Sequence, residues 1–248
     1  MATRPVHPIK PKKVAMPSKA LNVTAPPRAL GPTSRAAHDA KPSRRTNDPA
    51  RTMADILTVA THEFAERGFS GARIDEIAAA TRTSKRMIYY YFGSKEGLYL
   101  RVLEEAYGRM RAIESSLHLD DLEPLEALRR LVGFTFDHHQ GNQDFIRLVM
   151  AENIERGVYL SQSKGIRKLN VPAIDAVSKI YTRGLASGLF RPGLDPVDIH
   201  ASITALSFYN VSNQHTFGLI FQRNMQTPKA LSARRDSIIE TVLRFVCV

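Results

Sequence analysis

The sequence predicts an all-α fold in which a small three-helix head precedes a larger helical body. Three observations lead to this prediction. Apolar residues recur at helical spacing through most of the chain after residue 50, helix caps and stops separate the segments, and no stretch alternates as a strand does. The chain has 248 residues and is 43% hydrophobic, so it can bury a core of ordinary size.

Residues 1–50 differ from the rest in composition. They hold nine of the 14 prolines, ten lysines and arginines, two acidic residues and no aromatic Phe, Tyr or Trp. Such a segment buries too little apolar surface to offset the cost of ordering, so we expect a disordered, basic, proline-rich tail. Two interpretations stay open: a basic arm that touches DNA, or a solvated extension, including a translation start placed too early, with Met16 as a later start.

The charge and the single cysteine limit the compartment and the class of protein. The net charge is +11, but +8 of it lies in residues 1–50, so the basic composition alone is weak support for nucleic-acid binding. Cys247 cannot form a disulfide within the chain, which fits a reducing cytosol. We find no apolar run of membrane-spanning length and no secretory signal, and we expect a cytoplasmic protein without membrane association.

The predicted head occupies residues 51–98. Gly68 is the expected stop of the first helix, Ser84 is a good N-cap for the third, and Gly93 ends the third. Ser94 then caps a long fourth helix, with Glu96 in its first turn, where negative charge is favourable. The three head helices are expected at 52–68, 74–78 and 84–92.

The predicted body occupies residues 99–248. Prolines stand where several of its helices are expected to begin, a position at which the missing N–H costs nothing. The expected helices, after the fourth at 95–117, cover 124–140, 142–156, 161–169, 172–187, 195–215 with a possible extension to 222, and 228–246.

The third helix carries the sequence SKRMIYYYF and has a cationic, phenolic side. Helical geometry turns Lys85, Arg86, Tyr89 and Tyr90 outward. Ile88 and Phe92, four residues apart, point toward the head core. Two short helices joined by a tight turn resemble a helix-turn-helix, whose second helix enters the major groove of DNA.

These residue types suit DNA contacts. Lysine or arginine donates to guanine acceptors, and a bidentate pair gives about 1–3 kcal/mol of base discrimination. Tyr91, at the flank, can direct its hydroxyl to a phosphate. Lys95 beside the backbone N–H groups of the fourth helix forms a phosphate clamp, and Arg73 and Thr52, near two other helix starts, are lesser phosphate candidates.

The segment ATHEFAERGFSGARIDEIAAATRTSKRMIYYYFGSKEGLYLRVL resembles the DNA-binding head of the tetracycline-repressor (TetR) family. The resemblance covers about fifty residues, from Asp55 to Leu103, and the pieces within it that match at the family's spacing are FAERGF, IDEIA, SK..IYYYF and SKEGLY. The resemblance implies base-facing positions for Lys85, Arg86, Met87 and Tyr90, groove or phosphate positions for Tyr89, Tyr91 and Lys95, and a phosphate position at a helix start for Arg73. The predicted DNA-binding set consists of these eight residues together with Thr52 and the N-cap Ser84, which are proposed from their places at helix starts.

One departure from the family pattern lies in the turn. The family usually has small residues and glycine, then valine, where this chain has Thr81, Arg82 and Thr83. Glycine adopts positive φ at little cost, so we expect Arg82 to hold a strained turn or the turn to differ slightly.

The resemblance also implies a body that dimerises and binds a small effector. Two late segments have strongly apolar faces, and because these segments are terminal we expect a twofold dimer to bury the faces. The alternative is that they only pack the subunit's own core. These faces consist of Ile199, Ile203, Leu206, Tyr209 and Asn210 on one segment, and Ile238, Ile239, Val242, Leu243 and Val246 on the other.

Aromatic and polar residues on the middle helices are candidates for an effector site, which is typically apolar with a few convergent polar groups. An aromatic or anionic effector would suit them, and the alternative is that they are core or surface residues. We expect neither a cofactor nor a metal, because adjacent histidines such as His138 and His139 point about 100° apart on a helix. The candidates are Phe134, His138, Phe145, Met150, Asn153 and Phe208.

The function that follows is a DNA-binding transcriptional regulator, a repressor released from a palindromic operator by a small-molecule effector. One rival is an all-α enzyme, but the sequence contains no Gly-rich phosphate loop, nucleophile elbow or clustered metal spacing, so we expect no enzymatic activity. The other rival is an architectural DNA binder with no effector and little sequence preference.

Overall fold

Helices make up most of the part of the chain that the computed structural model describes, residues 48–248. Within this range there is no named strand, and one isolated bridge pairs Phe190 with Cys247. The all-α prediction is confirmed for these residues. The elements are α1 (Pro49–Gly71), α2 (Ile74–Ala80), α3 (Lys85–Phe92), α4 (Lys95–Ser115), η1 (Leu119–Asp121), α5 (Pro124–Gly141), α6 (Gln143–Ile154), η2 (Leu160–Gln162), α7 (Lys164–Ala186), α8 (Pro196–Ser212), α9 (Gln214–Phe221) and α10 (Pro228–Val246).

The first helix begins earlier than the sequence suggested. The Asp48 carboxylate accepts hydrogen bonds from the N–H groups of Ala50 and Arg51, at 3.0 and 3.3 Å, and Pro49 occupies the first turn. The helix therefore starts at Pro49 rather than at Thr52. Residues 1–47 of the predicted tail lie outside the described residues.

The end of α1 also differs from the prediction. Gly68 has φ +64°, so it interrupts the helix as expected of a stop residue, but a further turn carries α1 to Gly71. The predicted stop is a kink within α1.

The two predicted segments 161–169 and 172–187 form one helix, α7, so their separation was wrong. Ser163 caps it by accepting from the Ile166 N–H at 3.1 Å. Pro172 lies inside and removes one backbone hydrogen bond, yet Ala173 and Val177 beside it are buried and hold the helix in place.

The segment predicted at 195–215 is divided in two. α8 ends at Ser212, and α9 begins at Gln214 after the non-helical Asn213. Asp195 caps α8 as expected, accepting from the Val197 N–H at 2.8 Å.

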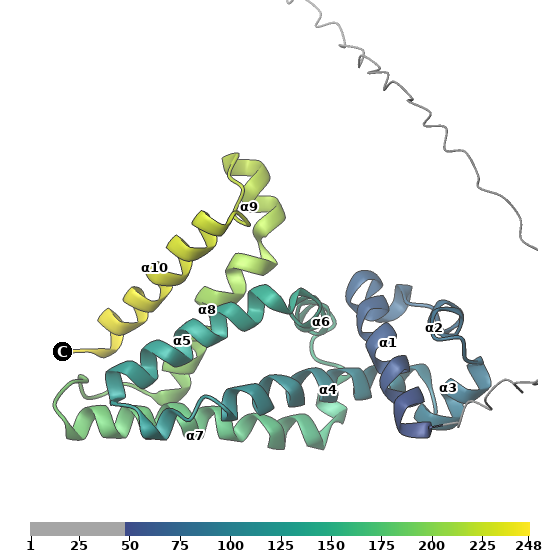
Figure 1. The fold of residues 1–248 in the computed structure, drawn as a ribbon, viewed down its shortest axis with the longest axis horizontal. Coiled ribbons are helices and arrows are strands. Elements are labelled where there is room, and N and C mark those ends of the chain that lie inside the picture. Colours follow the sequence, from purple (N-terminus) through teal and green to yellow (C-terminus); the bar gives the residue numbers. More distant parts are fainter. Residues whose placement is uncertain (1–47) are drawn as a thin grey trace, which may run out of the picture. The chain divides into compact units, whose positions relative to one another are not determined.

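The head consists of α1, α2 and α3 (Figure 1). Its core continues into the body. Ile56, Phe64, Ile77 and Ile88 are fully buried, in one cluster with Leu148 from α6. α1 packs against both α4 and α6, so the head is held by two body helices. The predicted boundary between residues 98 and 99 falls within α4, which belongs to both parts.

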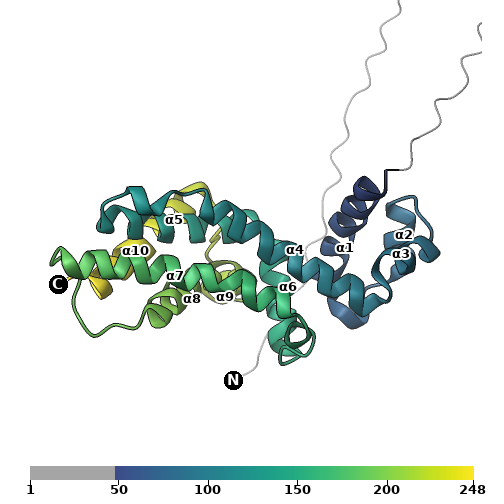
Figure 2. The ribbon, with the colours of Figure 1, turned by 90° about the horizontal axis from the view of Figure 1, so that it is seen from below.

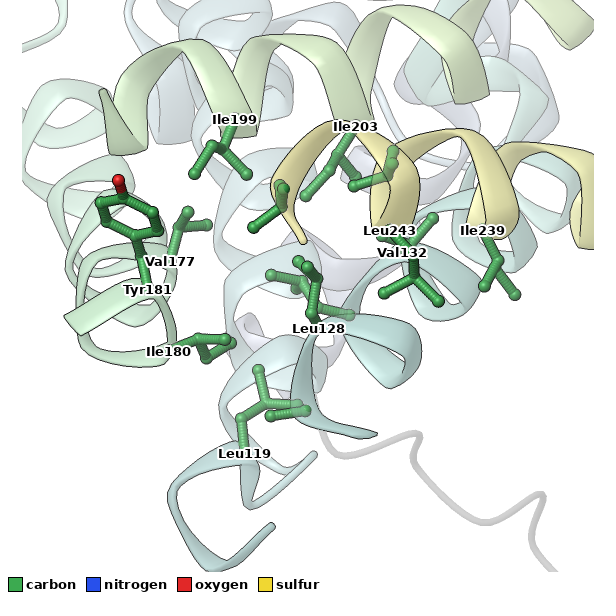
Figure 3. Close-up of a cluster of buried hydrophobic side chains, with 14 of the residues drawn as sticks. Leu119, Leu128, Val132, Val177, Ile180, Tyr181, Ile199, Ile203, Ile239 and Leu243 are labelled. Atoms are coloured by element: carbon green, nitrogen blue, oxygen red, sulfur yellow. The ribbon is translucent and has the colours of Figure 1, made fainter. Parts of the chain in front are cut away.

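In the body, α4 and α7 lie side by side, as Figures 1 and 2 both show, and α5 packs against α8 and α10. Side chains from α5, α7, α8 and α10 converge in the main core (Figure 3). None of the helices within residues 48–248 combines the length and apolar character needed to cross a lipid bilayer.

This core absorbs most of the two faces that were predicted to form the dimer interface. Ile199 and Ile203 of α8, and Ile239 and Leu243 of α10, are buried against α5 and α7 within the same subunit (Figure 3). The assignment of these faces to a partner was therefore wrong, because they already have a partner in their own chain. The other buried members are Asn210, Ile238, Val242 and Val246, with Leu206 packed at the edge of the core.

Candidate nucleic-acid interface and sensor core

The turn between α2 and α3 is tight and strained. The Thr83 N–H donates to the Ala78 carbonyl at 3.0 Å and the Arg82 N–H to that of Ala79 at 3.2 Å. Arg82 has φ +53°, in the left-handed region that favours glycine. The expectation of a strained Arg82 is confirmed.

Helix α3 has a capping residue at its start, a glycine at its end and a buried side chain on the side that faces the head core. The Ser84 hydroxyl accepts from the Met87 N–H at 3.2 Å, and Gly93 ends the helix with φ +75°. Ile88 is fully buried against the other head helices. These contacts determine which side of α3 faces solvent, and they give Ser84 a capping role.

The exposed side of α3 is the cationic, phenolic side. Lys85 and Arg86 are exposed, and Tyr89 and Tyr90 are 43% and 77% exposed. Both rings are therefore accessible to a partner on this side of α3. Met87 is half-buried beside this face.

Tyr91 lies at the flank, as expected. It is half-buried, and its ring lies edge-on to that of Tyr90 with the centroids 5.3 Å apart. It contacts the head core on one side and Tyr90 on the other, so it supports the exposed ring.

Asp75 of α2 was not singled out from the sequence. Its Oδ1 lies 2.5 Å from Nζ of Lys85, and both side chains are 52% exposed. The lysine of the exposed face is therefore paired before any DNA arrives.

Three residues expected at phosphates, Thr52, Arg73 and Lys95, lie near the starts of α1, α2 and α4 respectively. Lys95 places its Nζ 3.5 Å from the Ser70 carbonyl and 4.9 Å from the centre of the Phe69 ring. Arg73 is exposed at the N-cap of α2. Thr52 donates its hydroxyl to the Asp48 carbonyl at 3.0 Å, which leaves only acceptor capacity on the oxygen.

The predicted effector residues come together in part. Phe145 belongs to a small cluster between α4, α6 and α8, and Met150 and Phe208 pack against it. His138 lies with its ring centroid 5.7 Å from Phe134 and 5.8 Å from Phe145. The structure thus gathers five of the six.

Asn153 stands apart from this group. It is exposed at the end of α6, and its amide donates to the Val149 carbonyl at 2.8 Å. Its geometry gives no support for a place in the sensor core.

The sequence analysis missed a buried ion pair in α4. Arg111 Nη1 lies 2.7 Å from Glu114 Oε2, and both side chains are 10% exposed. Burial lowers the pKa of Arg111 and raises that of Glu114, and each opposes the other's shift through its charge. An arginine in a helix is usually a surface residue, so no local signal identified it.

The charge of Arg111 also acts on three histidines of α5 and α8, His138, His139 and His200. Burial, followed by the nearby charge of Arg111, lowers the pKa of His138 and of His200. Burial, then the charges of His138 and Arg111, lowers the pKa of His139 to about 4. All three imidazoles are therefore neutral near pH 7.

Several buried side-chain atoms of the body have no hydrogen-bond partner among the described residues. They include Nε and Nη1 of Arg111, Nδ1 of His138 and His139, the Ser207 hydroxyl and Nδ2 of Asn210, although Nη1 of Arg111 lies at ion-pair distance from Glu114. An unsatisfied buried polar group costs about 1–3 kcal/mol. We use the name polar core for the set of polar residues enclosed at different places in the body, which comprises Arg111, His138, His139, His200, Ser207 and Asn210.

A cavity of about 470 Å³ lies where the head meets the body. Thr58 and Thr61 of α1 form one wall, and Arg109 of α4, with His138 and Phe145, forms others. The cavity therefore adjoins both the head and two predicted effector residues.

Charged contacts join α1 to α6 beside this cavity. His62 Nδ1 lies 3.2 Å from Asp144 Oδ2, and Glu66 pairs with Arg147. The ligand-capable atoms of His62, Glu66 and Asp144 lie within 4.8 Å of one another, but Glu66 already pairs with Arg147 and Asp144 already contacts His62. We interpret the group as a link between head and body.

The fold and the exposed face of α3 define a helix-turn-helix DNA-binding protein with a helical sensor body. Comparison with known proteins gives the family. Residues 56–102 match the family model described as bacterial regulatory proteins, tetR family, and residues 124–242 match that of the tetracyclin repressor-like C-terminal domain. The chain belongs to the tetR family and is a DNA-binding transcriptional regulator.

Relatives agree with this assignment. The chain is 36% identical over 200 residues to the HTH-type transcriptional repressor NicS of Pseudomonas putida, covering 81% of this chain and 94% of that protein. It is 39% identical over 110 residues to the HTH-type transcriptional repressor SCO4008 of Streptomyces coelicolor, covering 44% of this chain and 54% of that protein.

Solved structures show the same fold. SCO4942 of Streptomyces coelicolor superposes with a TM-score of 0.60 at 27% identity, covering 79% of this chain and 98% of the other. The ketosteroid transcriptional regulator KstR2 of Mycobacterium tuberculosis also gives 0.60, at 20% identity, covering 82% and 97%, and this likeness concerns the fold alone.

Proposed function

We propose that the chain is a cytoplasmic repressor that binds a palindromic operator as a homodimer and leaves it when a small effector binds the body. The observation that carries the DNA part is the outward side of α3. It exposes two cations and two tyrosines on a helix whose opposite side is fixed by Ile88. Repression is the function stated in the names of both relatives described above.

In this proposal, Lys85, Arg86 and Tyr90 contact base edges in the major groove. Tyr89, Tyr91 and the residues at the starts of α2 and α4 contact the backbone. Base contacts provide sequence preference, and phosphate contacts set position.

The dimer surface has to differ from the one expected from the sequence, because most of the apolar faces of α8 and α10 are already covered. An alternative lies on the outward sides of these two adjacent helices. α8 exposes small or apolar residues at four-residue spacing, and α10 exposes a similar row of small residues, which permits close helix packing in a twofold dimer. The rows are Val197, Ala201, Ala205 and Tyr209, and Ala233, Ser237 and Thr241.

Coupling between effector and DNA follows from the contacts of α1. This helix is part of the head, yet it packs on α6 and borders the 470 Å³ cavity with Thr58 and Thr61. A molecule that enters there and moves α6 by a small distance also turns the head. Coupling of about 1–3 kcal/mol changes operator affinity about 5- to 150-fold.

Binding to selected and random duplex DNA over a range of salt concentrations tests this function. A regulator keeps a specificity ratio well above one at every salt concentration, because only the phosphate contacts are lost by screening. Equal affinity for both DNAs would favour the architectural rival and contradict the proposal.

A further inference from the structure

Three side chains with metal-ligating atoms meet where α1 of the head packs against α6 of the body. They are His62 and Glu66 of α1 and Asp144 of α6, and their ligand atoms all lie within 4.8 Å of one another. His62 and Asp144 are 82 residues apart in the chain. The group is therefore brought together only by the fold, and no local motif in the sequence marks it.

Two of the three side chains come from one side of α1. Residues four apart on a helix lie on the same face, and pairs of metal ligands on a helix use this spacing. His62 and Glu66 both face α6, since His62 contacts Asp144 and Glu66 contacts Arg147. Asp144, in the first turn of α6, supplies a third ligand from the opposite side.

The distance between His62 and Asp144 suits two ligands of one ion. Nδ1 of His62 lies 3.2 Å from Oδ2 of Asp144. Zinc lies about 2.0–2.2 Å from imidazole nitrogen and carboxylate oxygen, and in a tetrahedral site two such ligand atoms stand about 3.4 Å apart. An ion can therefore bind both atoms with little movement of the backbone. The Glu66 side chain is exposed, so it can rotate toward the same ion.

Arg147 competes with the ion for one of the ligands. Its guanidinium pairs with Glu66, and the two side chains are 37% and 45% exposed. Exposed ion pairs are weak, so breaking this one lowers the affinity for metal by about fivefold at most. Once Arg147 turns toward solvent, two carboxylates and one imidazole remain for a divalent ion.

The group can be reached from solvent and suits a particular class of ion. Asp144 lines the 470 Å³ cavity between head and body, and the His62 side chain is 69% exposed. Imidazole together with carboxylates suits zinc and similar transition metals, whereas Mg²⁺ and Ca²⁺ prefer oxygen ligands alone.

We propose that His62, Glu66 and Asp144 bind one divalent transition-metal ion, of which Zn²⁺ is the type, and that the ion joins the head to the body. The site goes beyond the proposed function, because it requires neither the effector nor DNA. A bound ion holds α1 against α6, at the same contact through which the effector is proposed to turn the head.

Calorimetric titration of the untagged full chain with Zn²⁺, after removal of metal by a chelator, tests this assignment. The wild type should bind one ion per subunit at this site, and excess Mg²⁺ should not displace it. His62→Gln and Asp144→Asn should each weaken Zn²⁺ binding by about tenfold or more, since the loss of even an outer partner of a metal ligand costs about 10–100-fold.

Three further variants keep the test decisive. His215→Gln removes an exposed histidine of α9, and Glu155→Gln removes an exposed carboxylate at the end of α6, so both should leave Zn²⁺ affinity unchanged. Arg147→Gln removes the competitor of the ion and should raise Zn²⁺ affinity by up to about fivefold. A general loss of folding cannot produce this gain.

The outcomes separate the metal site from the regulator function. Absence of Zn²⁺ binding by the wild type, or wild-type affinity in both His62→Gln and Asp144→Asn, would overturn the site and leave specific DNA binding unaffected. Weaker Zn²⁺ binding in Arg147→Gln would also contradict it, because the arginine would then support the ion rather than compete with it.

Discussion

Releasing Lys85 from Asp75 should strengthen DNA binding. In the free protein the two side chains form an ion pair at 2.5 Å on the surface that approaches DNA. The lysine can bind a base edge or a phosphate fully only when this pair is broken or shared. Asp75→Asn removes the competing charge and keeps the shape of the side chain.

The expected gain follows from the exposure of the pair. Both partners are 52% exposed, and exposed ion pairs contribute about 0.2–1 kcal/mol. Since 1.4 kcal/mol corresponds to a tenfold change, Asp75→Asn should raise affinity by up to about fivefold. The gain should shrink at high salt, where the pair is already screened.

Fluorescence anisotropy with a labelled operator duplex measures this change, and Glu76→Gln provides the matched control. Glu76 is the next residue of α2, is exposed and forms no ion pair among the described residues. Both variants remove one negative charge near the DNA, so only a larger gain in Asp75→Asn reports the release of Lys85. Equal gains in the two variants, or no gain in Asp75→Asn, would refute the reasoning.

Three other predictions concern the head and the polar core. Ile88→Ala should destabilise the protein by about 2–5 kcal/mol, seen as a lower Tm in calorimetry, because the side chain is fully buried under α3. Lys95→Ala should weaken selected and random DNA alike and reduce the salt slope by about one unit, and a changed base preference would contradict its phosphate role. Burial lowers the pKa of His139 to about 4 from an ordinary 6.5, so the unfolded chain binds the proton first and stability falls as the pH drops from 6.5 toward 4. The free energy of unfolding, measured by urea titration, should fall between pH 7 and pH 4.5, and His139→Gln should reduce this fall by up to about 3 kcal/mol. The same fall in both proteins would contradict a neutral buried imidazole.

Local signals made the head predictable. Ser84 and Gly93 fix the ends of α3 by capping chemistry that acts within a few residues, and the alternation of Ile88 with exposed tyrosines separates its two sides. The strained conformation of Arg82 was likewise visible as a non-glycine residue in a tight turn.

Errors arose where distant residues decide the outcome. Pro172 looked like a helix start, but the burial of its neighbours holds one continuous helix through it. The sequence pattern of an apolar helix side is the same whether the side packs within its own chain or against another chain. For this reason the apolar sides of α8 and α10 were assigned to a dimer interface rather than to the core of their own subunit. Arg111 has the sequence pattern of a surface residue, and only the packing of α4 against α5 and α7 buries it.

The central claim is that α3 of each subunit in a symmetric dimer contacts the bases of one half-site. Selection of bound sequences from random duplex DNA, run in parallel on the wild type and Arg86→Ala, tests this claim most directly. The wild type should enrich a palindrome whose half-sites lie about one helical turn or a multiple of it apart, and Arg86→Ala should lose preference at symmetric positions of both half-sites. Enrichment of an asymmetric site, or of the same sequence by both proteins, would contradict the account.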